Sequence, residues 1–284
     1  MALQQYAQRT SLGPVRVTPW LIEKLEICMG MKIALATPKG GSGKSTLTML
    51  LAGEFGNSGL SVMILDTDPQ KSVAQWFERC ANRNAKPENV QVEIVSDEGQ
   101  LAEFLSADGP DVTLVDVQGT ANQMLAIAAA HCDLVVVPCI PSELDATQAL
   151  KIPKYLEGFA GRGRVATPYR VVLNAVDGIE MRSNAFVETV VGMHDAGVKL
   201  ANTIVTKRQN YRLITNGRGS LHLIKKKDDA VLKAIANIEA LANELLDVVK
   251  SDGVKSGGHE ALREEALREH APAPDLAATT IKVN

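Results

Sequence analysis

The stretch Ala36-Thr-Pro-Lys-Gly-Gly-Ser-Gly-Lys-Ser-Thr46 decides the fold that this sequence predicts. It follows the apolar run 31–36, which is typical of a short buried strand, and it leads into an apolar-periodic helix that begins at Ser45. Glycines between a strand and a helix let the chain turn tightly, so that backbone N–H groups converge on an anion. The pattern therefore predicts a phosphate-binding loop.

The residues of this loop have separate expected tasks toward a nucleoside triphosphate. Gly40, Gly41 and Gly43 would supply the tight turn and leave room for phosphate oxygens. Lys44 would reach the β- and γ-phosphates as a point charge, and the Ser45 hydroxyl group would ligate a Mg²⁺ ion that bridges them.

The loop departs from the usual G-x-x-x-x-G-K-[ST] pattern at its first position, where Pro38 stands, and Lys39 directly precedes the glycine pair. The form K-G-G-x-G-K-[ST] resembles the deviant Walker motif of the ParA/MinD family of dimeric ATPases. This resemblance covers about residues 31–250 and implies ATP and Mg²⁺ as cofactors. It also implies a homodimer in which Lys39 crosses the interface to the nucleotide of the partner.

Three carboxylates follow buried strands that come after the loop. The run 59–66 ends at Asp66, the first residue of Asp66-Thr-Asp-Pro-Gln70, and the run 111–116 ends at Asp116, as in a Walker B strand. The carboxyl ends of strands in open α/β sheets line the ligand crevice, so these side chains should face the phosphate loop. The resemblance implies that Asp66 belongs to the Mg²⁺ shell and that Asp68 orients the attacking water. Asp116 would hold the metal through water.

Two further positions are compared with the family. Gly119 is expected to act as the hinge that senses the γ-phosphate, while the neighbouring Gln118 departs from the family pattern and has no assigned role. Asn174, the last residue of the expected strand 169–174, matches the position that reads adenine in the family. The sequence Asn174-Ala-Val-Asp177 is faintly similar to the N-K-x-D of guanine readers but lacks the lysine, which favours ATP over GTP.

The expected site therefore has three sets of residues. The catalytic set is Lys39, Lys44 and Asp68. The metal set is Ser45, Asp66 and Asp116. The nucleotide-binding set is Lys39, Gly40, Gly41, Ser42, Gly43, Lys44, Ser45, Thr46 and Asn174.

Composition limits the class of protein. With 284 residues and 45% hydrophobic residues, the chain is long enough for one α/β domain with appendages. Its net charge of −3 means that nucleic-acid binding would need a local basic patch. Cys28, Cys80, Cys132 and Cys139 form no C-x-x-C pair, and no apolar run approaches the roughly 20 residues that span a bilayer. These features favour a cytoplasmic protein with reduced thiols that serve packing.

A local basic patch is present in residues 196–227, called here the basic segment, which contains eight Lys and Arg residues and no Asp or Glu. It lies where the ParA branch carries a non-specific DNA surface, and its part 212–223 resembles conjugation-associated ParA relatives. The alternative is a solvated face without a ligand. The residues expected to contact DNA are Lys207, Arg208, Arg212, Arg218, Lys225, Lys226 and Lys227.

The alternation of strands and helices predicts an α/β fold with a mostly parallel, doubly wound sheet and helices on both faces. The domain is expected to span residues 31–250 and to end in an amphipathic helix over 229–249. Residues 1–30 are expected to form an extension with a short helix. Residues 251–284 are expected to be a mobile tail.

The resemblance implies a ParA-like ATPase that dimerises with ATP, binds DNA non-specifically and is released on hydrolysis. Its expected role is partition of a plasmid or other mobile element with a small ParB-like adaptor, and it would associate with the nucleoid in the ATP state. The alternative is a relaxosome or cargo-positioning ATPase of a conjugation system, with a relaxosome protein as partner.

Two alternatives belong to other classes. A MinD-like membrane-cycling regulator would need a basic amphipathic C-terminal helix, whereas this tail is acidic and alanine-rich, so no membrane partner is expected. An iron–sulfur reductase or an amide-forming ligase could share the scaffold, and only Cys132 supports that reading.

Overall fold

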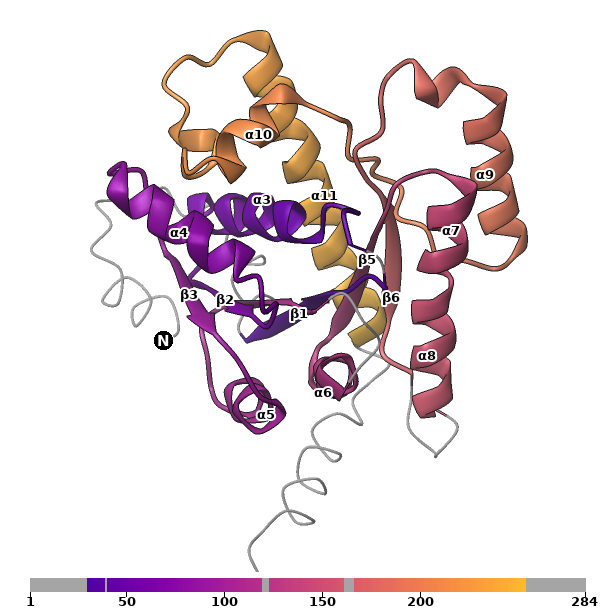
Figure 1. Ribbon diagram of the computed structural model, residues 1–284, viewed down its shortest axis with the longest axis horizontal. Helices are drawn as coiled ribbons and strands as arrows, with labels where there is room; N and C mark the ends of the chain where they lie inside the picture. The colour runs from indigo at the N-terminus through magenta and orange to yellow at the C-terminus, as the bar shows by residue number, and fades with distance from the viewer. Residues whose placement is uncertain (1–29, 39, 119–122, 161–165, 254–284) are drawn as a thin grey trace, which may run out of the picture.

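The computed structural model describes residues 30–38, 40–118, 123–160 and 166–253 (Figure 1). The expectations for the N-terminal extension, Lys39, the Gly119 hinge, Cys28 and the C-terminal tail lie outside these residues.

One sheet of six strands forms the centre of the described chain, and every strand pairing is parallel. The spatial order of the strands is β3-β2-β4-β1-β5-β6. The predicted α/β fold with a parallel sheet is therefore confirmed. The strands are β1 Met31–Leu35, β2 Val62–Asp66, β3 Val90–Ile94, β4 Val112–Asp116, β5 Leu134–Cys139 and β6 Tyr169–Leu173.

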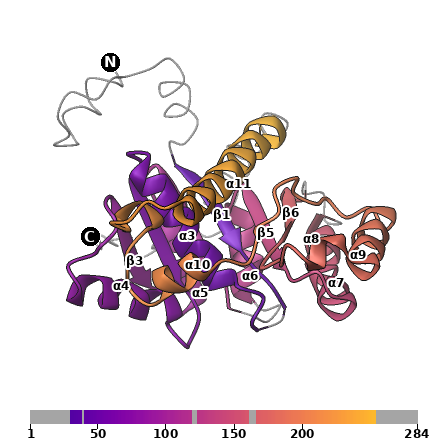
Figure 2. The ribbon, with the colours of Figure 1, turned by 90° about the horizontal axis from the view of Figure 1, so that it is seen from above.

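Helices cover both faces of this sheet, as Figure 1 shows. One face carries α3 Lys44–Asn57, α4 Ser72–Asn82, α10 Gln209–Thr215 and α11 Asp229–Gly253. Figure 2 looks down onto this face. The other face carries α5 Glu98–Ser106, α6 Gln123–His131, α7 Glu143–Ala149, α8 Lys151–Ala160 and α9 Asn184–Asp195. Two 3-10 turns, η1 Glu180–Arg182 and η2 Leu221–Leu223, complete the described elements.

The strands are apolar on both faces because both faces are covered. In β1, Ile33 and Leu35 pack toward α3, while Ala34 packs toward the opposite layer. Trp76 of α4 is fully buried in the layer that holds α3 and α11, so it is a core residue.

The sequence 141–156 predicts one continuous helix, and this prediction is wrong, since α7 ends at Ala149 and α8 begins at Lys151. The cause is Pro153, whose ring clashes with the carbonyl group four residues earlier, at Ala149. The final helix begins at Asp229 as predicted and continues beyond residue 249 to Gly253. No helix in the described ranges is long and apolar enough to cross a membrane.

Candidate nucleotide site

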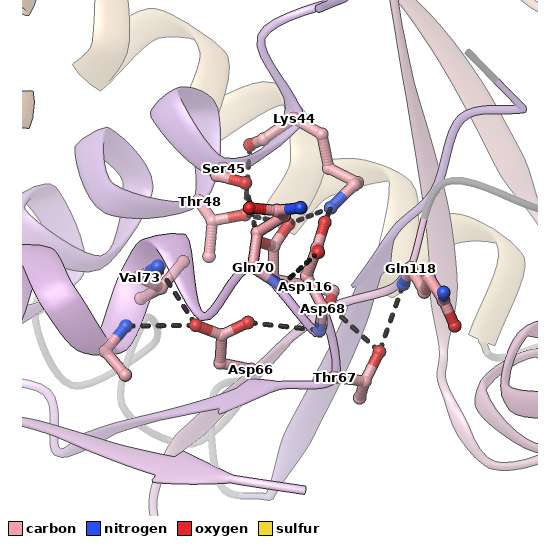
Figure 3. Close-up of polar contacts among 11 residues, drawn as sticks. Lys44, Ser45, Thr48, Asp66, Thr67, Asp68, Gln70, Val73, Asp116 and Gln118 are labelled. Carbon is pink, nitrogen blue, oxygen red and sulfur yellow. Dashed lines mark hydrogen bonds and ion pairs between the residues drawn. The ribbon is translucent and has the colours of Figure 1, made fainter. Parts of the chain in front are cut away.

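Three parallel strands bring the predicted site residues to one edge of the sheet. In the strand register, Leu35 of β1 and Asp66 of β2 both lie opposite Asp116 of β4. The glycine-rich loop follows β1 and leads into α3, so its lysine and serine reach the carboxylate of Asp116 (Figure 3).

The backbone of the loop has the conformation that its glycines predict. Gly41 and Gly43 have φ angles of +89° and +87°, in the left-handed region that favours glycine. No side chain caps the start of α3 at Gly43, and its first turn contains no acidic residue. The N-terminal N–H groups of a helix attract anions, so this end of α3 suits a phosphate group.

A second observation at the loop also fits a bound ligand. The hydroxyl oxygen of Ser42 is buried and has no hydrogen-bond partner among the described residues. Buried polar atoms are almost always paired, so an orphan in a loop of this sequence fits a site that a ligand completes.

The Asp116 carboxylate is the centre of the site. It is fully buried and accepts hydrogen bonds from the Lys44 ammonium group at 2.8 Å and the Ser45 hydroxyl group at 2.7 Å. The Thr48 hydroxyl group lies 3.4 Å from the same carboxylate. A carboxylate and a hydroxyl group in direct contact are oxygen ligands of the kind that Mg²⁺ accepts, together with phosphate oxygens and water. The residues present therefore fit the expected Mg²⁺ and nucleotide.

Asp68 lies beside this cluster and is more accessible to solvent. One of its carboxylate oxygens is 3.9 Å from the Lys44 ammonium group, and the other accepts the backbone N–H of Gln70 at 2.8 Å. The turn therefore fixes Asp68 with one oxygen directed toward Lys44. This position agrees with the expected water-orienting role, which stays a prediction.

The carboxylate oxygens of Asp66 are occupied by backbone N–H groups, whereas a direct metal ligand needs a free oxygen. Its carboxylate is fully buried and accepts backbone N–H groups of Asp68, Val73 and Ala74 at 3.2, 3.0 and 3.0 Å. Burial raises the pKa of this carboxyl group, and the neighbouring Asp116 raises it further, while the N–H group of Ala74 lowers it. In this structure Asp66 caps α4, whose own N-cap residue offers no side-chain hydrogen bond. Its metal role stays a prediction.

Asn174 reaches the loop from the end of β6. Its side-chain amide donates to the carbonyl oxygen of Ser42 at 2.8 Å, and a Cβ atom on Gly43 would lie only 2.3 Å from the same nitrogen. Asn174 thus holds the phosphate loop from the side, and Gly43 is the residue that permits this close approach. The expected contact of Asn174 with adenine stays a prediction.

Thr67 is a site residue that the sequence reasoning missed. Its hydroxyl group donates to the carbonyl oxygen of Asp116 at 3.1 Å and accepts the backbone N–H of Gln118 at 3.0 Å. The buried hydroxyl group therefore joins the segment after β2, which carries Asp68, to the segment after β4 (Figure 3). A threonine between two aspartates carries no sequence signal for this contact, because its partners lie about 50 residues away.

The residues expected to bind DNA lie mostly on exposed positions. Arg212, Arg218, Lys225 and Lys226 are exposed, as is Lys207, whereas Arg208 is half-buried. Lys227 has a structural contact, because its ammonium group donates to the carbonyl oxygens of Leu221 and His222 at 2.9 and 2.7 Å. Partial burial lowers the pKa of Lys227. Its contact with DNA, like that of the others, stays a prediction.

Comparison with known proteins places the chain in a family. Residues 31–249 match the model of the family described as VirC1 protein. The chain belongs to this family. It is also 31% identical over 216 residues to Protein ParA of Rhizobium radiobacter, covering 74% of this chain and 93% of that protein. The predicted membership of the ParA/MinD-like ATPases is thereby confirmed.

Solved structures support the same fold at low identity. The complex of the cell division proteins MinC and MinD from Aquifex aeolicus contains a chain with a TM-score of 0.58 and 18% identity, covering 75% of this chain and 96% of that chain. The septum site-determining protein MinD from Pyrococcus horikoshii, solved with Mg-ADP, has a TM-score of 0.56 and 16% identity, covering 77% and 98%. At these identities the likeness shows the fold alone.

The cap at Asp66 gives a first prediction. Replacing Asp66 with alanine removes the acceptor of two N–H groups at the start of α4, so the free energy of unfolding should fall by about 1 kcal/mol. Urea denaturation without nucleotide or metal measures this. Asp68→Ala, which removes one exposed turn contact, is the control and should change stability less. Equal stability of Asp66→Ala and the parent would contradict the capping role.

The hydroxyl group of Thr67 gives a second prediction. Thr67→Val removes the group that the two segments share and should slow ATP hydrolysis about fivefold, for a loss of about 1 kcal/mol. Nucleotide affinity should stay nearly unchanged, because the contacts of Lys44 and Ser45 do not involve Thr67. Thr67→Ser keeps the hydroxyl group and should restore kcat. Equal kcat values for Thr67→Val and Thr67→Ser would contradict this role of the hydroxyl group.

Proposed function

We propose that this protein is an ATPase that dimerises around ATP, binds DNA non-specifically in that state and is released after hydrolysis. Through this cycle it drives the partition or positioning of a plasmid or other mobile element. The observation that carries the proposal is the cluster of Lys44, Ser45 and Asp116 at the start of α3. The proposal is supported by homology to ParA/MinD-type ATPases, because this chain is 31% identical to Protein ParA and matches the VirC1 family model.

Positioning and charge supply most of the expected catalysis. Bound ATP with Mg²⁺ provides the phosphoryl group and a divalent charge that offsets charge on its oxygens. Lys44 is held by Asp116 at the edge of the loop, where a lysine can neutralise charge that develops on the phosphoryl oxygens. Asp68 stands at 3.9 Å from that lysine and would orient the attacking water. Lys39 would act across the dimer interface in the same way as Lys44.

DNA binding rests on the contrast between the basic segment and the rest of the chain. The protein has a net charge of −3, yet the segment 196–227 contains no acidic residue. Lysine and arginine side chains that neutralise phosphates bind any DNA sequence, because the phosphate backbone carries no base information. The proposed affinity is therefore independent of sequence, and specificity would come from a ParB-like adaptor. In a conjugation system a relaxosome protein would take the place of that adaptor.

The burial of two features weighs against a membrane-cycling regulator and an iron–sulfur enzyme. The apolar face of α11 that contains Val231 and Leu245 is buried against the core, so this face is not available to a membrane. The Cys132 thiol is fully buried, and this burial strongly raises its pKa, which disfavours the thiolate that an iron–sulfur cluster requires. Both observations favour the DNA-linked ATPase.

Two substitutions in the site should separate binding from hydrolysis. Lys44→Ala should abolish nucleotide binding or hydrolysis, because it removes the cation that contacts phosphate in the ground state. Asp68→Ala should keep ATP binding and lower kcat by about 100-fold or more, since orienting and activating water affects the reaction step. Equilibrium binding of a fluorescent ATP analogue and steady-state phosphate release measure the two effects. Normal hydrolysis by Asp68→Ala would show that the water-orienting assignment is wrong.

Lys39 provides a test of the dimer. Lys39→Gln should leave a protein that binds nucleotide and no longer dimerises on it, because a charge that acts in trans can act only across an interface. Light scattering with size exclusion, in the Asp68→Ala background with ATP, measures the dimer fraction. An unchanged dimer fraction would remove Lys39 from the interface.

A further inference from the structure

The loop that follows α10 lies against the C-terminal end of α4. A Cβ atom on Gly217 would lie 2.6 Å from the Cβ of Arg79, and one on Gly219 would lie 2.2 Å from the carbonyl oxygen of Ala85. Both glycines have φ angles in the left-handed region, at +84° and +74°. Two glycines in special conformations therefore press this loop onto a helix that is more than 130 residues away in sequence.

Polar contacts hold the same junction. The guanidinium group of Arg79 donates to the carbonyl oxygen of Thr215, the last residue of α10, at 3.2 Å. The buried Cys80 of α4 lies at the same junction, where burial raises the pKa of its thiol and the backbone of Gly219 lowers it. Arg79 thus links the end of α10 to α4, and this hydrogen bond fixes the position of one helix against the other.

This junction brings together cations from two parts of the chain. Arg218 stands between the two packed glycines and is exposed, and Arg212 is exposed one turn before the end of α10. On the other side, Arg83 and Lys86 directly follow α4 and are exposed. The ammonium group of Lys86 lies 4.7 Å from the centre of the Phe77 ring, which fixes its position on α4. Figures 1 and 2 both show α4 and α10 as neighbours on one face.

We infer that the DNA surface extends beyond the basic segment onto the end of α4, where Arg83 and Lys86 contact phosphates of the same duplex as Arg212 and Arg218. This inference rests on the proposed function and deepens it. The acidic residues on the same stretch, Glu78 and Glu88, leave the combined surface with an excess of positive charge. A DNA duplex presents phosphates at regular intervals along its surface. Exposed cations on two neighbouring elements can therefore contact several phosphates of one duplex at the same time.

The junction is also fixed to the helix that carries the phosphate loop. A Cβ atom on Gly53 of α3 would lie 2.7 Å from the Cβ of Ser220, so the two backbones are in close contact. On the next residue of α3, the Glu54 carboxylate pairs with the His222 ring at 2.8 Å. The combined surface therefore has a fixed orientation relative to the nucleotide site, while Arg83 and Lys86 take part in none of the contacts described for that site.

The test is a double substitution in the full-length protein, Arg83→Gln with Lys86→Gln. Arg79 stays unchanged because it holds the junction. Fluorescence anisotropy of a labelled 40-base-pair duplex, with ATP and the Asp68→Ala background, is measured over a range of salt concentrations. Each protomer of the ATP dimer loses two phosphate contacts, so the slope of log affinity against log salt should fall by about four units, roughly one for each lost contact. The thermal unfolding temperature should stay unchanged.

Lys151→Gln with Lys154→Gln is the matched control, because it removes the same charge from exposed positions of α8 on the opposite face. This control should keep the parental slope. An unchanged slope for the α4 pair, or an equal fall in the control, overturns the extended surface. If Arg212→Gln with Arg218→Gln weakens binding while the α4 pair does not, the proposed function stands and only the extension fails.

A different outcome would affect the proposed function itself. If the parent protein hydrolyses ATP and does not bind the duplex at any salt concentration, DNA is not the ligand of either part of the surface. Sedimentation with vesicles that contain anionic lipid identifies the competing ligand. Loss of vesicle binding in the α4 pair, without DNA binding in the parent, would assign the surface to a membrane and overturn the inference.

Discussion

The buried ion pair between Lys44 and Asp116 is the contact on which the site depends. It joins the first residue of α3 to the last residue of β4, and both groups are removed from solvent. A buried carboxylate that loses its cation is left with an unfavourable charge, so the pair fixes the loop, the helix and the central strand together. Ser45 and Thr48 add hydroxyl groups to the same carboxylate. A metal ion and phosphates would enter a cluster whose charges are already arranged.

Two contacts connect this cluster to the rest of the molecule. Thr67 joins the segments after β2 and β4, which links the predicted water-orienting carboxylate to the strand that carries Asp116. On the far side of α3, Glu54 and Gly53 hold the 3-10 turn and the loop that contains Arg218. The nucleotide site and the proposed DNA surface would thus belong to one packed unit. Dimerisation would bring two such surfaces onto one duplex without a change in either surface.

Sequence alone predicted the strands and the loop because each has a local signature. Short apolar runs identify buried parallel strands, and Gly-Lys-Ser after such a run identifies a phosphate loop. The orientation of side chains is a tertiary property and was not predicted in several cases. Asp66 turns toward α4, Asn174 holds the Ser42 carbonyl group, and Lys227 donates to two carbonyl groups of a 3-10 turn. Arg83 and Lys86 have ordinary surface positions in sequence, and only the packing of Gly217 and Gly219 brings them to the basic segment.

The central claim is that ATP controls DNA affinity by pairing two surfaces. Anisotropy of a labelled duplex, titrated with the Asp68→Ala protein in saturating ATP or ADP at one physiological salt concentration, tests it most directly. With ADP a single surface should bind weakly, with a Kd on the order of 10⁻⁴ to 10⁻⁶ M. With ATP two linked surfaces should bind about 100-fold more tightly or better, through effective concentration. Equal affinity in the two nucleotides would contradict the account.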